Sequence, residues 1–337
     1  MVQTVLVTGA AGGFGSTLVR HLTDAGYAVR ALARENDPIN LIPLEPRYIT
    51  LGLVQDPSAL DRAAADADAI VHCAALLPGA KASRADFFDT NVKGTVQAIE
   101  TAIRRRMRKA IFFSTISVVD HVTRQISRRE LFDYIVDSDD PYLSSKIAAE
   151  RAVMSAGHQF AGDFAVVRPA FIYGPGNFGV WRDAFQLLST GRMRLIGKGS
   201  ARLPLAHSDD VARYVLALLG SATIQDPIHV VANPEATTMR TVFDTLAELL
   251  YVPPPSTVPF GIALAAAYAV ELLPASLRIG PLAILTKARV RQYGNGYDLS
   301  GVLEHALLRK TMLISARKGL TEMAQDWRRL SGHPVGT

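Results

Sequence analysis

A cluster of glycines near the start of the chain constrains the fold more than any other feature. The stretch VLVTGAAGGFGSTLVRHL, residues 5–22, places Gly9, Gly12 and Gly15 between a short apolar run and a run with helical spacing. Glycine is costly inside regular structure, so such a cluster indicates a tight turn or a close approach to the backbone. One glycine permits the turn, the next lets a pyrophosphate approach, and the last lets helix and strand pack closely. With free N–H groups at the helix N-terminus, the stretch predicts a dinucleotide-binding site rather than a merely structural turn.

Short apolar runs alternate with helical runs through the first half of the chain. The predicted strands cover residues 4–9, 27–34, 47–53, 68–75, 109–117 and 163–174. The predicted helices cover residues 14–26, 58–67, 91–106 and 142–156. This alternation predicts an α/β fold of the Rossmann type, a doubly wound parallel sheet with helices on both faces.

The alternation loosens after residue 173, which divides the chain into two predicted domains. Residues 1–173 are predicted to form the dinucleotide-binding domain, and residues 205–232 are expected to return to it with one more strand. Residues 174–204 and 233–330 are predicted to form a smaller, mostly helical C-terminal substrate domain. A proline-rich break at residues 253–260 precedes a tail of helical pieces and loops.

Composition and charge bear on the compartment and the partners. Cys73 is the single cysteine among 337 residues, which excludes an internal disulfide, and the first residues lack a secretory signal pattern. Both observations favour the cytoplasm. The net charge of +5 brings nucleic acid into question, but the basic run at residues 104–109 is typical of the solvated end of a helix. No nucleic-acid motif accompanies that run, so we expect no nucleic-acid partner.

A second apolar run, at residues 259–274, raises the question of a membrane. It is too short for an integral membrane segment, which takes about 20 residues. We interpret it as a core helix, and a helix lying on a membrane surface or at a substrate mouth is the alternative. The sequence leaves that choice open.

The end of the second predicted strand bears on the choice between NAD and NADP. An acidic residue there would bind the ribose hydroxyls, but the stretch YAVRALARE has Ala33 at that position. Arg34 follows, and its guanidinium can hold a 2′-phosphate with two parallel hydrogen bonds. The sequence therefore predicts NADP, while the neighbouring Glu35 keeps NAD possible.

Tyr142 and Lys146 are the candidate catalytic pair. They lie four residues apart in the stretch PYLSSK, so on a helix they share one face. A lysine ammonium beside a phenol favours the phenolate, and we expect it to lower the tyrosine pKa from about 10 toward neutrality. Ser114 and Thr115 end the fifth predicted strand, where a hydroxyl is able to hold a substrate oxygen beside Tyr142. The simpler alternatives are an exposed helix pair and a strand-end cap.

With these motifs in order, the sequence resembles the extended short-chain dehydrogenase/reductase superfamily, with NAD-dependent epimerase/dehydratase character. The matching segments are TGAAGGFG, IVHCAA, NVKGT with Asn91, FFSTISVVD, YLSSK, RPAFIYGPG and AHSDDVARYVLALL. The resemblance implies that Tyr142 is the general acid–base and that Thr115 orients the substrate oxygen. It implies that Lys146 binds the nicotinamide ribose and lowers the tyrosine pKa. It also implies a small-molecule substrate and a homodimer.

The cofactor-binding residues implied by the resemblance follow the sheet edge from the glycine turn to the catalytic helix. They are Gly9, Gly12, Gly13, Phe14, Gly15, Arg34, Leu53, Ala74, Tyr142, Lys146 and Pro169. His72 and Cys73 lie in a strand that the family keeps as core, so we interpret both as packed residues. No second ligand cluster accompanies them, and no metal is expected.

The departures from the family pattern concern the substrate. Leu53 stands where many relatives have an aspartate beside the adenine, and Ile116 and Ser117 replace the acidic pair of the dehydratases. Leu203 stands where nucleotide-sugar epimerases often have an arginine, and the neighbouring Arg202 is able to compensate.

The C-terminal segments PLAILTKARVRQYGNGYDLS and ISARKGLTEMAQDW are similar to the tail of the 3β-hydroxysteroid dehydrogenase-like branch. That similarity implies an apolar substrate. Residues 116–141 and the chain after residue 174 are expected to shape the pocket, although neither segment identifies the substrate.

The hypothesis is an NADP-dependent oxidoreductase that transfers hydride between nicotinamide and a carbonyl or carbinol carbon of a steroid-, terpenoid-, polyketide- or lipid-like substrate. Reduction is favoured because cells tend to keep NADPH reduced. A nucleotide-sugar epimerase with a tightly held cofactor is the first alternative. A non-catalytic NADP sensor is the second, although a sensor has no need of Thr115, Tyr142 and Lys146.

Overall fold

A seven-stranded parallel sheet forms the centre of the computed structural model, which describes residues 2–119, 126–135, 140–274, 277, 285–303 and 306–331. The strand order is β10-β6-β5-β4-β1-β2-β3. The strands are β1 (Thr4–Thr8), β2 (Ala28–Ala33), β3 (Ile49–Leu51), β4 (Ala69–His72), β5 (Lys109–Phe113), β6 (Asp163–Pro169) and β10 (Ile228–Val231). The order reverses between β1 and β4, which opens a crevice at the carboxyl ends of the strands. The Rossmann-type prediction is confirmed.

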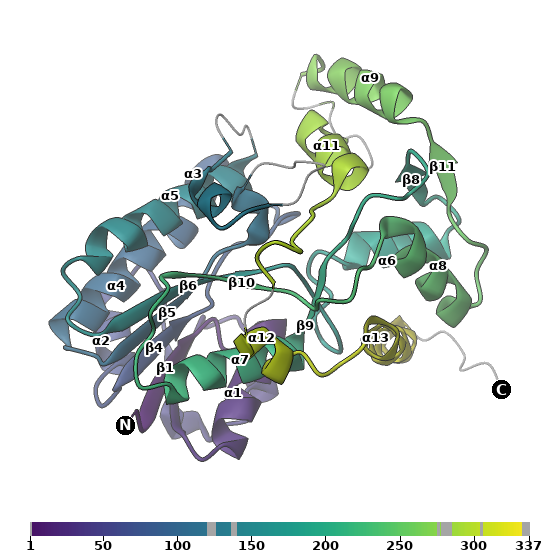
Figure 1. The fold of residues 1–337 in the computed structure, drawn as a ribbon. Helices are drawn as coiled ribbons and strands as arrows, with labels where there is room; N and C mark the ends of the chain where they lie inside the picture. Colours follow the sequence, from purple (N-terminus) through teal and green to yellow (C-terminus); the bar gives the residue numbers. More distant parts are fainter. Residues whose placement is uncertain are drawn as a thin grey trace.

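Helices cover both faces of this sheet (Figure 1). The helices of this half are α1 (Gly13–Asp24), α2 (Pro57–Ala63), α3 (Arg84–Phe88), α4 (Gly94–Arg104), α5 (Pro141–Gly157) and α7 (Ser208–Gly220). Apolar residues of α1 and α7, such as Leu18 and Val215, join one core. Residues of α2 and α4, such as Leu60 and Ile99, join the core on the opposite face. The strands read as continuous apolar runs because both faces are buried.

Most of the remaining helices form a second lobe beside the sheet (Figure 1). The lobe contains α6 (Arg182–Ser189), α8 (Met239–Leu250), α9 (Phe260–Glu271), α11 (Lys287–Asn295) and α13 (Ala316–Ser331). Helix α12 (Ala306–Thr311) lies instead beside α7, and its Leu308 joins the core on that face of the sheet. Trp181, Phe185 and Leu246 belong to a separate apolar core between α6, α8 and α13. The division of the chain into domains stays a prediction, although β10 does lie in the main sheet.

Three local predictions need correction. The strand expected over residues 163–174 divides at Ala170, whose N–H bonds to β10, and β7 (Phe171–Tyr173) pairs instead with β9 (Leu205–His207). The proline-rich break contains a strand, β11 (Ser256–Val258), which pairs with β8 (Arg194–Ile196). The helix expected from residue 91 starts earlier, because α3 and a π-helical turn (Asp89–Lys93) run directly into α4.

The basic run at residues 104–109 also differs in part from the solvated helix end that the sequence predicts. Arg104 ends α4 and pairs with Asp61 at 3.0 Å on the surface. Lys109, in contrast, is buried at the start of β5 and donates to the carbonyl oxygens of Leu218 and Ser221 at 2.7 and 2.6 Å. The ammonium therefore satisfies carbonyl groups at the C-terminal end of α7.

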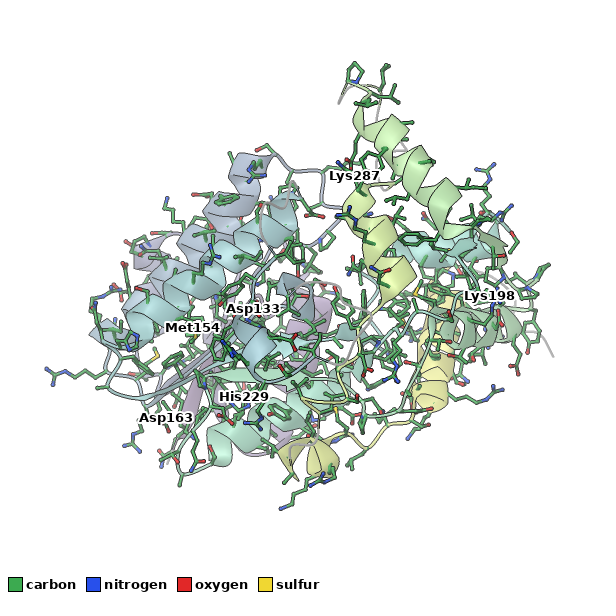
Figure 2. The ribbon with its side chains drawn as sticks, turned by 45° about the horizontal axis from the view of Figure 1, so that its top comes forward. Asp133, Met154, Asp163, Lys198, His229 and Lys287 are labelled. Carbon is green, nitrogen blue, oxygen red and sulfur yellow. The ribbon has the colours of Figure 1, made fainter. Side chains whose placement is uncertain are left out.

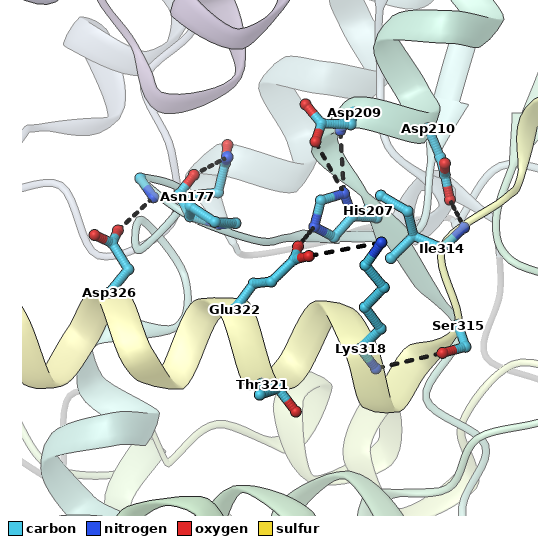
Figure 3. A network of polar contacts seen from close by, with 12 residues as sticks. Asn177, His207, Asp209, Asp210, Ile314, Ser315, Lys318, Thr321, Glu322 and Asp326 are labelled. Atoms are coloured by element: carbon cyan, nitrogen blue, oxygen red, sulfur yellow. Dashed lines mark hydrogen bonds and ion pairs between the residues drawn. The ribbon is translucent and has the colours of Figure 1, made fainter. Parts of the chain in front are cut away.

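A polar network joins α13 to the edge of the crevice (Figure 3). His207 is the N-cap of α7, and its Nε2 lies 3.4 Å from the carboxylate of Glu322 on α13. Burial lowers the pKa of His207, although the carboxylates beside it oppose that effect. Asp326, also on α13, accepts a hydrogen bond from the N–H of Gly176 at 2.9 Å. Helix α13 thus holds the loop at Gly176 and Asn177, which borders the candidate site.

Candidate active site

A cavity of about 640 Å³ runs along the carboxyl ends of the sheet strands and reaches α11 in the second lobe. All of the residues assigned from the sequence to the cofactor and to catalysis line it, and those assignments stay predictions. They are Gly9, Gly12, Gly13, Phe14, Gly15, Arg34, Leu53, Ala74, Thr115, Tyr142, Lys146 and Pro169. A cavity of this size is within the range that binds small molecules and cofactors.

The glycine turn has a shape that side chains would destroy. Gly9 has a φ of +67°, and a Cβ there would lie 2.8 Å from the backbone of Ala74. A Cβ on Gly15 would lie 2.1 Å from the carbonyl oxygen of Gly9. A Cβ on Gly13 would lie 2.5 Å from the carbonyl oxygen of Gly176. The turn is therefore packed against its own backbone at Gly15 and against neighbouring backbone at Gly9 and Gly13, so side chains do not fit at these positions.

The N-terminus of α1 fits a pyrophosphate. Gly12 is the N-cap, and no side chain of the described residues caps this helix. The first-turn N–H groups and the positive end of the helix dipole then face the cavity, which is the arrangement that binds phosphate groups. The residues present thus fit a dinucleotide.

Arg34 is held by an acid that the sequence analysis missed. Its Nε and terminal nitrogen donate to Oδ1 of Asp37 at 3.0 and 2.7 Å, and its backbone N–H donates to Oδ2 at 2.9 Å. The Arg34 side chain is 63% exposed and that of Asp37 is 14% exposed. Both residues line the cavity beside Leu53. Ala33 supplies no acid at the end of β2, but Asp37 places a carboxylate beside Arg34. Asp37 follows Arg34 by three residues, a spacing visible in the sequence.

Tyr142 and Thr115 meet at the middle of the cavity. Asp140 caps α5 by accepting from the N–H groups of Tyr142 and Leu143 at 2.9 and 3.1 Å, which fixes the first turn of the helix. The Thr115 hydroxyl lies close enough to Tyr142 to act on the pKa of its phenol, which it lowers. Thr115 Oγ1 also accepts from the N–H of Ser117 at 3.2 Å, so the hydroxyl caps the strand end as well.

The expected lowering of the Tyr142 pKa is wrong for this structure. Burial raises the pKa of Tyr142 well above its usual value, and the hydroxyl of Thr115 only partly opposes it. Lys146 donates instead to the carbonyl oxygen of Phe113 at 2.6 Å, and burial lowers the pKa of Lys146 to about 8. The phenol is therefore protonated at neutral pH, which is the form that donates a proton to a carbonyl oxygen.

Asn91 contacts α5, the helix that carries the candidate pair Tyr142 and Lys146, through Ser145. Its Nδ2 donates to Ser145 Oγ at 2.9 Å and to the carbonyl oxygen of Leu76 at 3.2 Å. Its Oδ1 accepts from the N–H of Leu76 at 2.7 Å. The amide thus ties α5 to the loop after β4, and Leu76 of that loop lines the cavity.

His72 and Cys73 differ in their surroundings. His72 is 2% exposed between the hydroxyls of Thr8 and Thr95, at 2.9 and 3.0 Å, and burial lowers its pKa to about 3. Its interpretation as a packed residue is confirmed. Cys73 is partly exposed and lines the cavity, and burial of its thiol raises its pKa. Among the described residues, no group of three or more His, Cys, Asp or Glu side chains is placed to hold a metal ion.

Comparison with known proteins places this geometry in a family. The family model described as "NAD dependent epimerase/dehydratase family" matches residues 5–232. The chain belongs to this family. Its members are nicotinamide dinucleotide enzymes of the extended short-chain dehydrogenase/reductase fold, so the prediction of an oxidoreductase-type enzyme with a nicotinamide cofactor is confirmed at this level.

Three relatives illustrate the range of the family. The 2-alkyl-3-oxoalkanoate reductase of Stenotrophomonas maltophilia is 28% identical over 259 residues, covering 74% of this chain and 76% of that protein. A 3 beta-hydroxysteroid dehydrogenase/Delta 5-->4-isomerase of Mycobacterium tuberculosis is 31% identical over 59% of this chain, and the match spans only 55% of that protein. The UDP-glucuronic acid 4-epimerase of Bacillus cereus, solved with NAD, covers 97% of this chain and 99% of its own, with a TM-score of 0.72 and 18% identity. The last likeness concerns the fold alone.

Part of the cavity wall comes from the chain after residue 174, as the sequence analysis expected, although it named none of the individual residues. Arg289, Gln292 and Tyr293 reach the cavity from α11, and Asp183 reaches it from α6. Burial raises the pKa of Tyr293; the cation of Arg289 opposes that effect, and the carboxylates of Asp140 and Asp183 add to it. Tertiary packing decides which side chains of α11 line the cavity. Of the segment 116–141, residues 120–125 and 136–139 lie outside the described residues.

The positions of Leu203 and Arg202 bear on the arginine that nucleotide-sugar epimerases often have. Leu203 is 3% exposed in the core of the second lobe. Arg202 donates to Asp298 at 2.8 Å. The described residues that line the cavity include neither Leu203 nor Arg202. Arg202 therefore does not take the place of the expected arginine.

Proposed function

We propose that this enzyme is an NADP-dependent ketone reductase acting on a substrate with an apolar body. The observation that carries the proposal is the convergence of Thr115, Tyr142 and Lys146 in one cavity. A bound nicotinamide supplies the hydride in such a reaction. We take reduction as the direction because cells tend to keep NADPH reduced, and Tyr142 is then the proton donor.

The chain's own residues have distinct roles in this proposal. Thr115 holds the ketone oxygen, and Tyr142 donates its phenolic proton to that oxygen as the carbonyl carbon is reduced. Lys146, with a pKa of about 8, remains mostly an ammonium at neutral pH. In this proposal it binds the hydroxyl groups of the nicotinamide ribose beside Tyr142. Asp140 and Asn91 fix the helix that carries both residues.

The lining of the cavity supports a 3-oxo acid as the substrate. Leu76, Leu77, Phe171 and Val180 supply apolar surface, and Arg289 supplies a cation that suits a carboxylate. The name of the Stenotrophomonas maltophilia relative, a reductase of 2-alkyl-3-oxoalkanoates, supports the same class.

A nucleotide-sugar epimerase is the second candidate, favoured by the fold likeness to the Bacillus cereus epimerase. Leu203 stands where such epimerases often have an arginine, and the described residues that line the cavity include neither Leu203 nor Arg202. Those two positions therefore supply no guanidinium to pair with a diphosphate. This difference is our reason for ranking the epimerase second.

The substrate test measures NADPH consumption by the purified protein with a freshly prepared long-chain 3-oxo acid, its methyl ester and a cyclic ketone. We expect turnover with the acid and a higher KM with the ester. Arg289→Gln should remove the difference between acid and ester, because only the acid offers a carboxylate. Tight binding of a UDP-sugar, seen as a thermal shift that grows with its concentration, would instead support the epimerase.

The cofactor test compares NADPH with NADH. A charge-assisted phosphate contact is worth about 1.5–3 kcal/mol, or about 10-fold to 150-fold in affinity. Arg34 is largely exposed and already paired with Asp37, so we expect a preference for NADPH near the lower figure. Arg34→Ala should remove it, and the control Asp37→Asn should strengthen it by freeing the guanidinium. Equal binding of both cofactors by the unmodified protein would contradict NADP selectivity.

We also propose that the enzyme acts in the cytoplasm as a homodimer. The single cysteine supports a reducing compartment. Light scattering on the purified protein tests the dimer, and a monomeric mass at working concentration would contradict it. Within the described part of the chain, no helix is long and apolar enough to cross a membrane.

A further inference from the structure

Helix α9 is apolar on all sides, yet half of it faces solvent. Residues 260–270 contain no charged side chain. Ala263 and Ala267 pack beneath the helix in a small core with Val290 of α11, and Val270 is buried on the same side. A helix that is apolar all round is normally buried in a protein or in a membrane. The exposed side of α9 therefore needs an explanation.

The outer face of α9 presents large apolar side chains together. Ile262 is 61% exposed, Tyr268 is 48% exposed and Leu272 is 86% exposed. Their spacing places them on one side of the helix, opposite the packed alanines. Leu273, just after the helix, is exposed as well. A contiguous apolar face of this kind marks an interaction site rather than ordinary scatter.

The charge beside this face is positive. Helices α9 and α11 contain one acid, Glu271, and three cations, Lys287, Arg289 and Arg291. Lys287 lies where α11 begins, next to α9 (Figure 2), and pairs with Glu271 at 2.8 Å. Arg291 is exposed on α11. Apolar side chains beside cations are the combination that binds an anionic lipid surface.

The same charge argues against a second copy of the chain as the occupant. Two α9–α11 faces meeting each other would bring like charges together, which disfavours association. An anionic bilayer instead pairs with the cations and receives the apolar side chains. α9 has 12 residues, too few to span a bilayer but suited to lying in its interface.

The position of α11 links this face to the candidate active site. Val290 of α11 packs toward α9, whereas Ala288, Arg289, Gln292 and Tyr293 of the same helix line the cavity. Figure 1 shows α9 at the outer edge of the second lobe, with α11 between it and the sheet. A surface that held α9 would therefore lie near the substrate end of the cavity.

We propose that the outer face of α9, formed by Ile262, Tyr268, Leu272 and Leu273, docks this enzyme on an anionic lipid bilayer surface. The helix lies in the plane of the interface with its apolar side chains in the headgroup region, and the exposed Arg291 of α11 meets the lipid charges. Docking itself does not depend on the proposed function. The advantage of drawing an apolar ketone from the bilayer does rest on it.

The test is flotation of the full chain with vesicles of phosphatidylcholine alone or mixed with phosphatidylglycerol. We expect the protein to float with the anionic vesicles and to be released by high salt. The double variant Ile262→Glu/Leu272→Glu should reduce the vesicle-bound fraction at least tenfold, and Arg291→Glu should reduce it through charge alone. The control Leu330→Glu, at a 64% exposed leucine on α13, should float like the parent.

Thermal melting and NADPH titration establish that each variant is folded. The proposal is overturned if the parent stays in the aqueous fraction with both vesicle types, or if Leu330→Glu loses as much binding as the double variant. It is also overturned if light scattering shows that the double variant only splits a dimer. Turnover of a short, water-soluble ketone should be unchanged in the double variant. If the parent protein turns over a ketone but binds neither vesicle type, docking alone is refuted; if the parent binds anionic vesicles but turns over no ketone, the proposed function alone is refuted.

Discussion

Replacing Tyr142 with phenylalanine tests the core of the proposed chemistry. The substitution removes one hydroxyl, which lies close to Thr115, and keeps the buried ring. The backbone N–H groups that Asp140 caps are untouched, so α5 should keep its first turn. Because burial holds the phenol protonated at neutral pH, the variant loses a general acid. That loss should lower kcat by about 10²–10⁴-fold, or about 2.7–5.5 kcal/mol of transition-state stabilisation.

The stability cost should be small by comparison. One buried hydrogen bond contributes about 1 kcal/mol, and the control Tyr214→Phe removes such a bond, from Tyr214 to His229 at 2.8 Å. Tyr214 does not line the cavity in the part of the chain that the structure describes. Both variants should therefore lose similar stability in urea unfolding, whereas only Tyr142→Phe should lose turnover.

The assay pairs NADPH consumption with a cofactor titration. Tyr142→Phe should bind NADPH almost as the parent does, and Lys146→Ala should lose both binding and turnover. The pKa of Lys146 is about 8, below its ordinary value, so its charge is lost as pH rises through about 8. The alkaline limb of kcat/KM should lie there rather than at the higher pKa of Tyr142. If Tyr142→Phe turns over a confirmed substrate within about threefold of the parent, far less than a general acid contributes, the mechanism is wrong.

Three further substitutions test packing and electrostatics. Gly13→Ala should lower the free energy of unfolding by about 1–3 kcal/mol in thermal melts and weaken NADPH binding, because its Cβ would lie 2.5 Å from the carbonyl oxygen of Gly176. The control Gly261→Ala should cause no loss of stability, because a Cβ there meets open space. Glu150→Gln should destabilise the protein by about 3–5 kcal/mol in urea, because it leaves the fully buried Arg168 without its ion pair; a loss below about 1 kcal/mol would contradict a tight pair. Hydrogen bonds, chiefly with His21, hold the pKa of Asp209 below its usual value, so Asp209 stabilises the fold above about pH 4 and loses that effect as pH falls. Asp209→Asn should therefore reduce the loss of unfolding free energy on the acid side of a stability profile against pH. An unchanged acid side would refute the contribution of Asp209.

Local patterns explain why much of the site was predictable. The glycine turn and the Tyr142–Lys146 spacing are set by residues close together in the chain, and parallel strands bring their carboxyl ends to one edge. The chain after residue 174 was expected to shape the pocket, and α11 does line the cavity. The individual residues Arg289 and Tyr293 were not predictable, because tertiary packing decides which side chains of α11 reach the cavity. Asp37 could have been found, since its pairing with Arg34 spans three residues.

The same reasoning explains the wrong expectation for Tyr142. The spacing of Tyr142 and Lys146 predicts a shared helix face, but whether the ammonium or the burial decides the phenol pKa depends on where the lysine points. That direction is a tertiary property, because the carbonyl group that receives the ammonium comes from β5.

One face of α5 combines catalysis with core packing. Tyr142, Lys146 and Glu150 follow each other at intervals of four residues, so they share that face from the cavity to the core. Burial lowers the pKa of Lys146, and the charge of Glu150 opposes that effect. Glu150 in turn accepts from the guanidinium of Arg168 and from the hydroxyl of Tyr134 at 3.0 Å. A buried ion pair that looks purely structural thus helps keep the candidate catalytic lysine charged, and replacing it with apolar residues should stabilise the core only at the expense of the lysine.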